Sequence, residues 1–465
     1  MRRMRPARHA RIVIGALLVW LSGVVAPAFD RSAQPAPGAR YLEAAKGAAA
    51  WVRSTAVATP KGRDWPPDPL KPAALSPSLY AGTPGVVLFF LELARATGDR
   101  SYLDDAARGA ETVLAAADGA QGAGLWEGLA GSAFVLQETA KATGDRRFAD
   151  GARRVTDTIV RRAKPAGAGV EWSDTTDIIA GSAGTGLFLL YAARELQQPA
   201  LAQLAARAGL RLIELARKDN AGLKWAMDPT FPRLMPNFSH GTAGIAYFLA
   251  ALYEETRDRR FLDAAVAGAR YLQAVAKTDG DVCLFFHDEP DGRELYYLGW
   301  CHGPVGTARL FFELYRVTKD RAWLGWVEKS AQALRASGIP EARTPGFWNN
   351  VGQCCGSAGV ADFFLALWRE TGDARDLAFA RRLIDDMLAR ATPEAGGLKW
   401  IQAEHRTQPS LLVAQTGYMQ GAAGIGSALV HIAATLDKRP AGIRLPDSPF
   451  NTPLHLSRVV LSPES

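Results

Sequence analysis

The chain has 465 residues, of which 22% are charged and 48% hydrophobic, and its formal net charge is +7. This ordinary globular composition leaves room for one large core or for two to three domains. Five arginines lie in the first eleven residues, so the remaining chain carries only +2. Because no basic stripe with interleaved aromatic residues is present either, the sequence gives no support for a nucleic-acid partner.

The first 28 residues have the pattern of a secretory signal peptide. The five arginines precede an apolar run from Ile12 to Val25, and the small-x-small sequence Ala26-Pro27-Ala28 follows it. A basic region, a short apolar region and a small-residue cleavage site together predict export to the periplasm or the medium. The alternative is an uncleaved membrane anchor, because the apolar run is only a little short for a span. No later segment is long and apolar enough, so the mature chain is expected to have no stable membrane span.

Three further regions follow the leader. Residues 29–40 are rich in proline and alanine and are predicted to form a linker. Residues 41–437 are predicted to form the folded domain. Residues 438–465 form a Pro-rich tail without helical periodicity, which is expected either to wrap the surface or to be disordered.

Seven segments of the domain share one pattern, in which a loop leads into Gly-x-x-Gly and then into an apolar helix. Each apolar helix is expected to be buried on most sides, and the helix after it is amphipathic. The spacing between segments suits two helices and two loops, so the repeat predicts an all-α (α/α)7 toroid with seven inner and seven outer helices. The first glycines are Gly82, Gly128, Gly181, Gly241, Gly303, Gly356 and Gly421.

Local signals support this pattern of paired helices. Several inner helices end in Thr-x-Asp turns such as Thr97-Gly98-Asp99, where the middle residue fits a C-cap and the aspartate is placed to cap the next helix. The paired glycines are expected to allow close approach of neighbouring inner helices and to permit positive φ at the helix entry. The helix N-termini then point to one end of the ring. Side chains just before each first glycine should therefore line a shared central cavity.

Three of the four cysteines occupy the two positions before a first glycine. They are Cys301, Cys354 and Cys355. Three protein ligands with one open position are typical of a catalytic zinc, and soft thiolates favour zinc or copper(I). A disulfide between Cys301 and Cys354 is the competing interpretation for an exported chain. Cys283 is interpreted as a core residue.

Histidines and carboxylates lie in the same register. His240 is either a general acid/base or a hydrogen-bonded histidine at a helix start. Asp177 is placed either to orient it or to cap a helix, and Glu127 is a weaker candidate of the same kind. His302, next to Cys301, is a candidate fourth ligand, second proton carrier or neighbour of the metal. Repeats one and seven are predicted to be purely structural, and the sequence suggests no role for His287, His405 and His431.

Together these features resemble the LanC family of lanthionine synthetases and their LanC-like relatives, over roughly Tyr41 to Leu436. The motifs that carry the resemblance are SHG at 239–241, GWCHG at 299–303 and QCCG at 353–356. The resemblance implies an α/α toroid with one zinc ion per chain. It implies Cys301, Cys354 and Cys355 as the zinc ligands, with Cys355 at the position of the family's usual histidine ligand. This set is similar to the three-cysteine variant of some fused lanthipeptide synthetases.

The resemblance also implies roles for the neighbouring residues and a reaction. His240 would handle protons with Asp177 as its partner, and His302 stands where the cyclases commonly have tyrosine. The implied reaction adds a cysteine thiolate to dehydroalanine or dehydrobutyrine and forms a thioether, with the proton supplied by His240 or His302. Because the chain has no kinase-like or dehydratase region, a separate dehydratase would have to supply the dehydrated substrate.

Three other functions are compatible with the sequence. The same site could transfer a small thiol such as glutathione to dehydrated residues. Glu127 and Asp177 could serve as the paired carboxylates of a carbohydrate-active toroid. The chain could also be a non-catalytic zinc-binding scaffold for a peptide or cell-envelope partner. Loss of all three cysteines would abolish zinc binding but spare a carbohydrate-active enzyme.

Overall fold

The computed structural model describes residues 36–73, 76–231, 233–440 and 442–450. The predicted signal peptide, linker residues 29–35 and the tail beyond residue 450 lie outside the described residues. The chain divides into two compact units, Met1–Ala36 and Pro37–Ser465, and the described helices and strands belong to the second. Within the described ranges, no helix has both the length and the apolar character needed to cross a bilayer.

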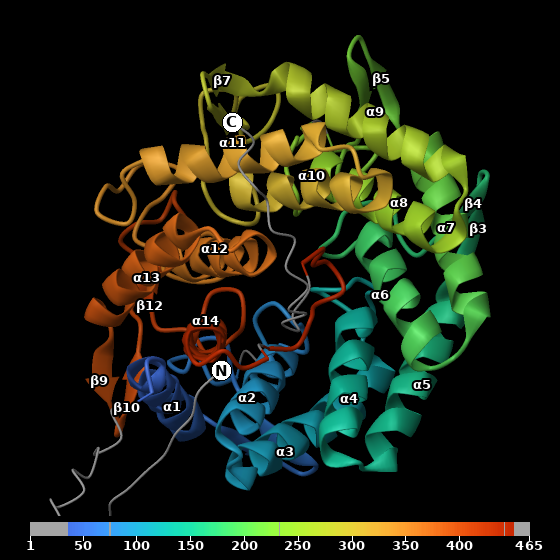
Figure 1. The fold of residues 1–465 in the computed structure, drawn as a ribbon. Coiled ribbons are helices and arrows are strands. Elements are labelled where there is room, and N and C mark those ends of the chain that lie inside the picture. Colours follow the sequence, from blue (N-terminus) through green and yellow to red (C-terminus); the bar gives the residue numbers. More distant parts are fainter. Residues whose placement is uncertain (1–35, 74–75, 232, 441, 451–465) are drawn as a thin grey trace, which may run out of the picture. The chain divides into compact units, whose positions relative to one another are not determined.

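Seven apolar helices of the described chain form a closed inner ring. Each begins directly after the first glycine of a repeat, consecutive helices contact one another, and the last contacts the first (Figure 1). Their first turns are buried almost completely, as their all-round apolar character predicts. These helices are α2 (Thr83–Thr97), α4 (Leu129–Thr143), α6 (Ser182–Glu195), α8 (Thr242–Thr256), α10 (Pro304–Thr318), α12 (Ser357–Thr371) and α14 (Ala422–Leu436).

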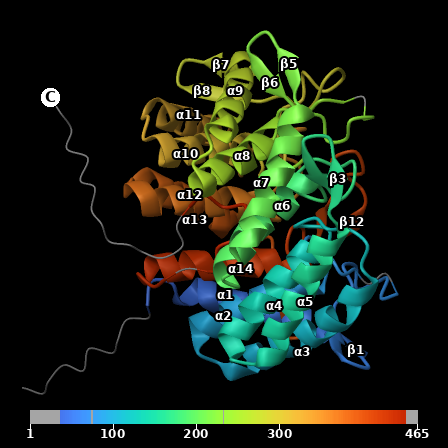
Figure 2. The ribbon, with the colours of Figure 1, turned by 90° about the vertical axis from the view of Figure 1, so that its right-hand side faces the viewer.

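Seven amphipathic helices of the described residues lie outside this ring, each packed against one inner helix. The partner of α14 is the first helix of the chain, α1 (Ala39–Ser54), so the two run side by side and close the ring (Figure 2). Helix α1 begins two residues inside the predicted linker. The all-α toroid of seven inner and seven outer helices is thus confirmed. The remaining outer elements are α3 (Arg100–Ala116) with the 3-10 turn η1 (Ala117–Gly119), α5 (Arg146–Arg162), α7 (Pro199–Glu214), α9 (Arg259–Val275), α11 (Ala322–Ala336) and α13 (Ala374–Ala389).

The Thr-x-Asp turns cap both helices that they join, as predicted. Gly98 has a φ of 73° and ends α2, and the carboxylate of Asp99 accepts a hydrogen bond from the N–H of Ser101 in the first turn of α3. The same two caps join α4 to α5 and α12 to α13. Each turn therefore satisfies backbone groups that a helix end leaves unpaired.

The paired glycines allow close packing. The first glycine of each repeat precedes its helix in an extended conformation, with a φ of −127° at Gly303, so the predicted positive φ at the helix entry is wrong. The second glycine meets the chain six residues earlier. A Cβ on Gly306 would collide with the carbonyl oxygen of Trp300 and with the Phe238 side chain of the preceding repeat. The glycines thus let neighbouring repeats meet closely at the ring mouth.

Short antiparallel hairpins, which the sequence analysis did not predict, lie between the helix pairs. After several of them a tryptophan Nε1–H donates to a carbonyl 13 residues earlier, at the end of the outer helix, as from Trp65 to Val52 and from Trp225 to Leu212. This bond satisfies a helix-end carbonyl that would otherwise lack a partner. The hairpins of the described residues are β1 (Val57–Thr59) with β2 (Gly62–Asp64), β3 (Lys164–Ala166) with β4 (Gly169–Glu171), β5 (Arg217–Asp219) with β6 (Gly222–Lys224), β7 (Lys277–Asp279) with β8 (Val282–Leu284), β9 (Thr392–Glu394) with β10 (Gly397–Lys399), and β11 (Gln402–Ala403) with β12 (Leu412–Val413).

The described part of the C-terminal tail packs against the ring. The N–H of Ile443 donates to Glu92 at 2.8 Å, Asp447 is fully buried, and Phe450 packs on Phe312 and Phe363. Of the two possibilities predicted for the tail, residues 442–450 therefore follow the one in which it packs on the protein.

A buried ion cluster joins the first and last inner helices. His431 on α14 contacts Asp362 on α12 through Nδ1 at 2.9 Å and Glu92 on α2 through Nε2 at 3.2 Å. Burial alone would lower the pKa of His431, but the charges of Asp362 and Glu92 outweigh burial and raise the pKa to about 10. The histidine is therefore protonated at neutral pH and links helices from both ends of the repeat array.

We expect His431→Gln to destabilise the protein in a pH-dependent way. The folded-state pKa of His431 lies above the unfolded value near 6.5, so its stabilisation is complete below about pH 6.5 and is lost as the pH rises through about 10. The difference in unfolding free energy between wild type and variant, on the order of a few kcal/mol at low pH, should shrink towards pH 10. Urea unfolding at pH 6, 8 and 10 measures it, and a constant difference would refute the ion-cluster explanation.

Candidate metal centre and active site

A cavity of about 590 Å³ opens at the ring mouth where the inner helices begin. Its walls come largely from the loops before the first glycines, as the repeat predicts. It brings together candidate residues from repeats two to six that are up to 228 positions apart in the sequence. The predicted site residues that line it are Glu127, Asp177, His240, Cys301, His302, Cys354 and Cys355.

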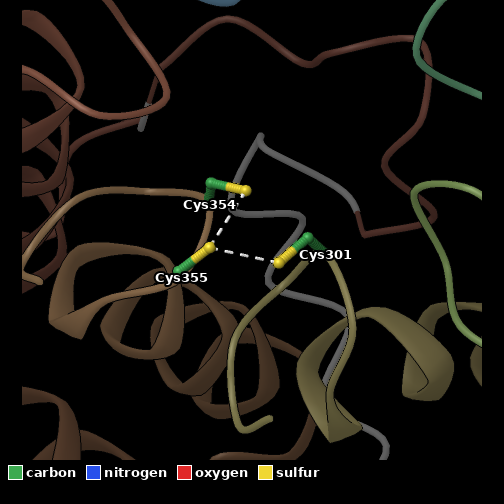
Figure 3. Close-up of side chains that lie close together, drawn as sticks. All are labelled: Cys301, Cys354 and Cys355. Atoms are coloured by element: carbon green, nitrogen blue, oxygen red, sulfur yellow. Dashed lines mark hydrogen bonds between the residues drawn. The ribbon is translucent and has the colours of Figure 1, made fainter. Parts of the chain in front are cut away.

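The three cysteines converge in one buried cluster (Figure 3). The Sγ atoms of Cys301 and Cys355 are 3.2 Å apart, those of Cys355 and Cys354 are 3.4 Å apart, and all three lie within 4.8 Å of one another. Backbone hydrogen bonds hold their loops together. The N–H of Trp300 donates to the carbonyl of Cys354 at 2.9 Å, and the N–H of Cys354 donates to the carbonyl of Met419 at 3.0 Å.

The cluster fits a metal ion better than a disulfide. All four cysteines of the chain lie within the described residues and are free thiols, so the alternative Cys301–Cys354 disulfide is not formed. Zinc–sulfur bonds of about 2.3 Å in a tetrahedron place sulfur atoms about 3.8 Å apart, close to the spacing seen here. The described residues offer three clustered ligands that could hold a metal ion.

Electrostatics lead to the same conclusion. Burial raises the pKa of the Cys301 thiol, and hydrogen bonds with Cys301 and Cys354 raise that of Cys355. The neighbouring Cys301 and Cys355 thiols lower the pKa of Cys354, with Cys355 as its hydrogen-bond donor, so negative charge in the cluster is favoured on Cys354. Three thiolates at this spacing require a compensating cation, which a divalent metal supplies.

Asp177 and His240 form a fixed pair beside the cysteines. The Nδ1 atom of His240 lies 2.6 Å from Oδ2 of Asp177, and Oδ1 of Asp177 accepts hydrogen bonds from the N–H groups of Ala180 and Gly181. Burial opposes protonation of His240, but the hydrogen bond and charge of Asp177 outweigh it and raise its pKa above 6.5. Asp177 therefore orients His240 and holds its own loop in place, but it does not cap helix α6, which begins without a side-chain cap, so the helix-cap interpretation is wrong. The other imidazole nitrogen, Nε2, makes no hydrogen bond within the described residues.

A second histidine pair forms the adjacent wall. The ring of His302 stacks on that of His287, with centroids 4.2 Å apart and planes 9° from parallel, and the edge of Tyr297 packs on both. His302 is not among the clustered metal ligands. The sequence analysis missed His287 because it lies in the loop after hairpin β7–β8, outside the glycine register, and only the fold brings it next to His302.

Repeats one and seven, which were predicted to be purely structural, also line the cavity through Tyr80 and Gln420. The Tyr80 hydroxyl is hydrogen-bonded to Cys354, and Nε2 of Gln420 donates to that hydroxyl at 3.1 Å and lies 4.0 Å from Sγ of Cys355. Both residues directly precede the first-glycine turn, the register that identified the cysteines. Their position, though not their chemistry, was visible in the sequence.

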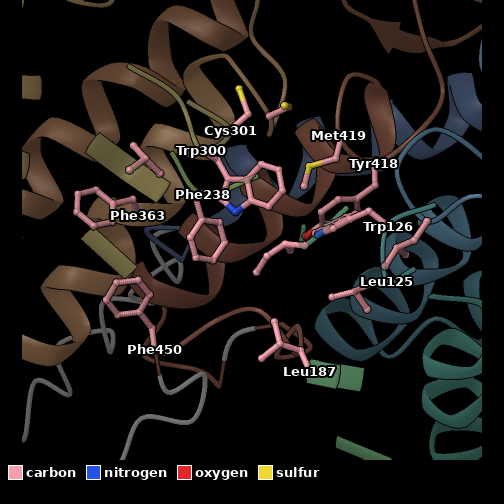
Figure 4. Close-up of a cluster of buried hydrophobic side chains, with 14 of the residues drawn as sticks. Leu125, Trp126, Leu187, Phe238, Trp300, Cys301, Phe363, Tyr418, Met419 and Phe450 are labelled. Atoms are coloured by element: carbon pink, nitrogen blue, oxygen red, sulfur yellow. The ribbon is translucent and has the colours of Figure 1, made fainter. Parts of the chain in front are cut away.

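Aromatic side chains pack next to the cavity, and polar side chains lie at its rim. Trp300, which directly precedes Cys301, packs on Trp126, and Trp126 packs on Tyr418 (Figure 4). Trp300 lines both the cavity and a smaller chamber, and the chamber is also lined by Trp126, Tyr418 and residues of the segment 442–450. The loop between β11 and β12 forms part of the rim, where Nε of Arg406 donates to the hydroxyl of Tyr297 at 3.2 Å.

Comparisons with known proteins agree with this architecture. The family model of lanthionine synthetase C-like proteins matches residues 73–441. No curated protein sequence matches the chain. Among solved structures, nisin cyclase is similar with a TM-score of 0.55 and 16% identity, covering 85% of this chain and 98% of its own. A Listeria innocua protein gives a TM-score of 0.48 at 15% identity, covering 87% of this chain and 99% of its own. An α-1,6-mannanase of Salegentibacter gives a TM-score of 0.47 at 14% identity, covering 85% of this chain and 99% of its own. Because the model matches most of the chain, the protein belongs to the lanthionine synthetase C-like family.

Proposed function

We propose that this protein is a zinc-dependent enzyme that adds a cysteine thiol of a peptide to a dehydroalanine or dehydrobutyrine residue and so forms a thioether. The observation that carries the proposal is the convergence of three cysteine sulfurs and the Asp177–His240 pair in one cavity. Family membership and the structural likeness to nisin cyclase support it, since that name describes ring formation.

The proposed metal site consists of Cys301, Cys354 and Cys355. A zinc ion held by them would lower the pKa of a substrate thiol bound at the open fourth position, so that this thiol reacts as a thiolate at neutral pH. Tyr80 and Gln420 contact the cysteines from the neighbouring loops and hold their orientation.

The reaction requires one proton to leave the substrate thiol and one to reach the α-carbon of the dehydroamino acid. The substrate thiol loses a proton, a carbon–sulfur bond forms at the β-carbon, the carbon–carbon double bond breaks, and the α-carbon gains a proton. His240 is the proposed proton donor, because Asp177 raises its pKa and leaves Nε2 free. The net result is addition of S–H across the double bond, with no redox change.

The substrate must reach this protein already dehydrated. Dehydroalanine and dehydrobutyrine arise by elimination of water from serine and threonine, and we propose that a separate dehydratase performs that step. We further propose that residues 1–28 direct export, so that the addition takes place outside the cytoplasm. N-terminal sequencing of the protein recovered outside the cell tests this point, because an N-terminus at Met1 would exclude cleavage of the leader.

The pairing within the site argues against the carbohydrate-active alternative. A glycosidase needs two carboxylates free to act on a sugar. Both carboxylate oxygens of Asp177 already have hydrogen-bond partners, one in His240 and the other in two backbone N–H groups. The carboxylate is therefore not free to act on a sugar. Glu127 alone does not supply the required pair.

We expect the zinc-loaded protein to convert a dehydrated peptide that contains one cysteine and one dehydroalanine into a thioether without a change in mass. The free thiol should disappear, which N-ethylmaleimide labelling and mass spectrometry will show. A product heavier by one glutathione, formed only when glutathione is added, would identify the small-thiol transferase instead. Zinc binding with neither product would identify the non-catalytic scaffold and refute the proposed enzyme.

A further inference from the structure

His302 is a buried side chain whose ring nitrogens have no partner. Only 8% of the residue is exposed, and neither Nδ1 nor Nε2 makes a hydrogen bond within the described residues. A buried donor or acceptor without a partner costs about 1–3 kcal/mol, so proteins rarely leave one unpaired without a function for it. Both nitrogens are also closed off from solvent, and since His302 lines the candidate cavity, a group that enters the cavity would supply the missing partner.

The surroundings of His302 fix its orientation. The ring lies flat on His287, whose Nδ1 is 3.0 Å from a carboxylate oxygen of Asp288, and Tyr297 packs at a steep angle beside the two stacked rings. The backbone carbonyl of His302 accepts a hydrogen bond from Nδ2 of Asn237. A ring that is clamped yet unpartnered is preorganised to bind a group that arrives with the substrate.

Two alternative roles fit less well. His302 is outside the cluster of metal ligands, so the structure does not place it as a fourth ligand. It also has no carboxylate partner of its own, whereas His240 has Asp177. The two imidazoles are 5.7 Å apart between centroids, so one substrate residue can contact both.

We infer that His302 donates a hydrogen bond to the carbonyl oxygen of the dehydroamino acid and that His287 positions it for this role. The inference rests on the proposed function. When the carbon–sulfur bond forms, the electron pair of the double bond moves through the α-carbon onto this oxygen and makes an enolate. His302 stabilises that charge, and the enolate collapses to the carbonyl as the α-carbon takes the proton from His240. In this proposal His240 supplies the proton, and His302 stabilises the oxyanion by a hydrogen bond.

The test compares substitutions that keep or remove the donor, in the zinc-loaded full-length protein with the dehydrated peptide. His302→Phe removes the donor but keeps a flat ring, and His302→Gln keeps an N–H donor. We expect His302→Phe to lower kcat by about 100-fold, the usual effect of losing one oxyanion donor, while KM and zinc content stay near wild type. His302→Gln should recover part of the lost kcat.

His287 provides a test of positioning. His287→Phe preserves the stacked ring and should retain more of the wild-type kcat than His287→Ala, which removes the surface on which His302 rests. Zinc content and thermal unfolding of each variant show whether the fold and the metal site are intact. A lower kcat in His287→Ala with unchanged unfolding is the signature of lost positioning.

Four results would overturn the proposed role of His302. A wild-type kcat in His302→Phe, or equal losses in the Phe and Gln variants, would overturn the donor role while the proposed function stands. Loss of zinc in His302→Phe would make His302 a ligand and overturn the donor role too. If the wild-type protein forms no thioether, the proposed function fails and the oxyanion role fails with it.

Discussion

Replacement of Cys354 by alanine is expected to remove zinc from the purified protein and to abolish thioether formation. Cys354 is the one cysteine of the cluster whose pKa is lowered, because the neighbouring Cys301 and Cys355 thiols favour its thiolate and Cys355 donates a hydrogen bond to it. Its removal leaves two protein ligands, too few for a stable site. Loss of the several kcal/mol that a metal contributes to the transition state should lower kcat/KM by roughly 10³-fold or more.

Cys283→Ala is the matched control for this prediction. Cys283 is also buried and free, but its only hydrogen-bond partner recorded among the described residues is Ser330, away from the cluster. The control should therefore keep its zinc and its activity. If Cys354→Ala retains a full equivalent of zinc, or if Cys283→Ala loses it, the assignment of ligands is wrong. Metal analysis of both variants after gel filtration makes the measurement.

Replacement of His240 is expected to have the second largest effect. His240→Asn should lower kcat by roughly 10² to 10⁴-fold, the range for loss of a general acid, while zinc binding stays intact because His240 is not among the clustered ligands. Measurement of kcat and of zinc content in the same preparation separates a catalytic role from a structural one. Loss of zinc together with activity would show that His240 only supports the metal site.

The pH profile gives an independent test of the same residue. Asp177 raises the pKa of His240, so the protonated donor persists above pH 6.5 and activity declines as the pH rises through this raised value. Asp177→Asn removes the charge that stabilises the imidazolium. The alkaline limb of the kcat profile should then move to lower pH, and a limb that stays in place would assign the proton to another group.

The fold could be predicted from the sequence because its signals are local and repeated. Each Gly-x-x-Gly turn marks an inner helix, and each Thr-x-Asp turn marks the junction with its outer partner. The outer partner of α14 was the exception, because α1 lies at the other end of the chain and nothing local links them. The hairpins were missed as well, since strands of three residues are too short to show an alternating pattern.

The site could be predicted only where chemistry coincided with the repeat register. Cys301, Cys354, Cys355, His240 and Asp177 all stand within four residues of a first glycine, and the structure brings them together. His287 lies outside this register and reaches the site only through tertiary packing. Tyr80 and Gln420 were in register, but tyrosine and glutamine are common in structural roles, so their residue types gave no signal.

X-ray absorption at the zinc edge of the purified full-length protein will show whether three cysteines hold a zinc ion. We expect about one zinc per chain with three sulfur neighbours at about 2.3 Å. In Cys354→Ala the zinc should be absent. A wild-type protein without zinc, or one whose zinc has only nitrogen and oxygen neighbours, would show that the three cysteines are not a zinc site.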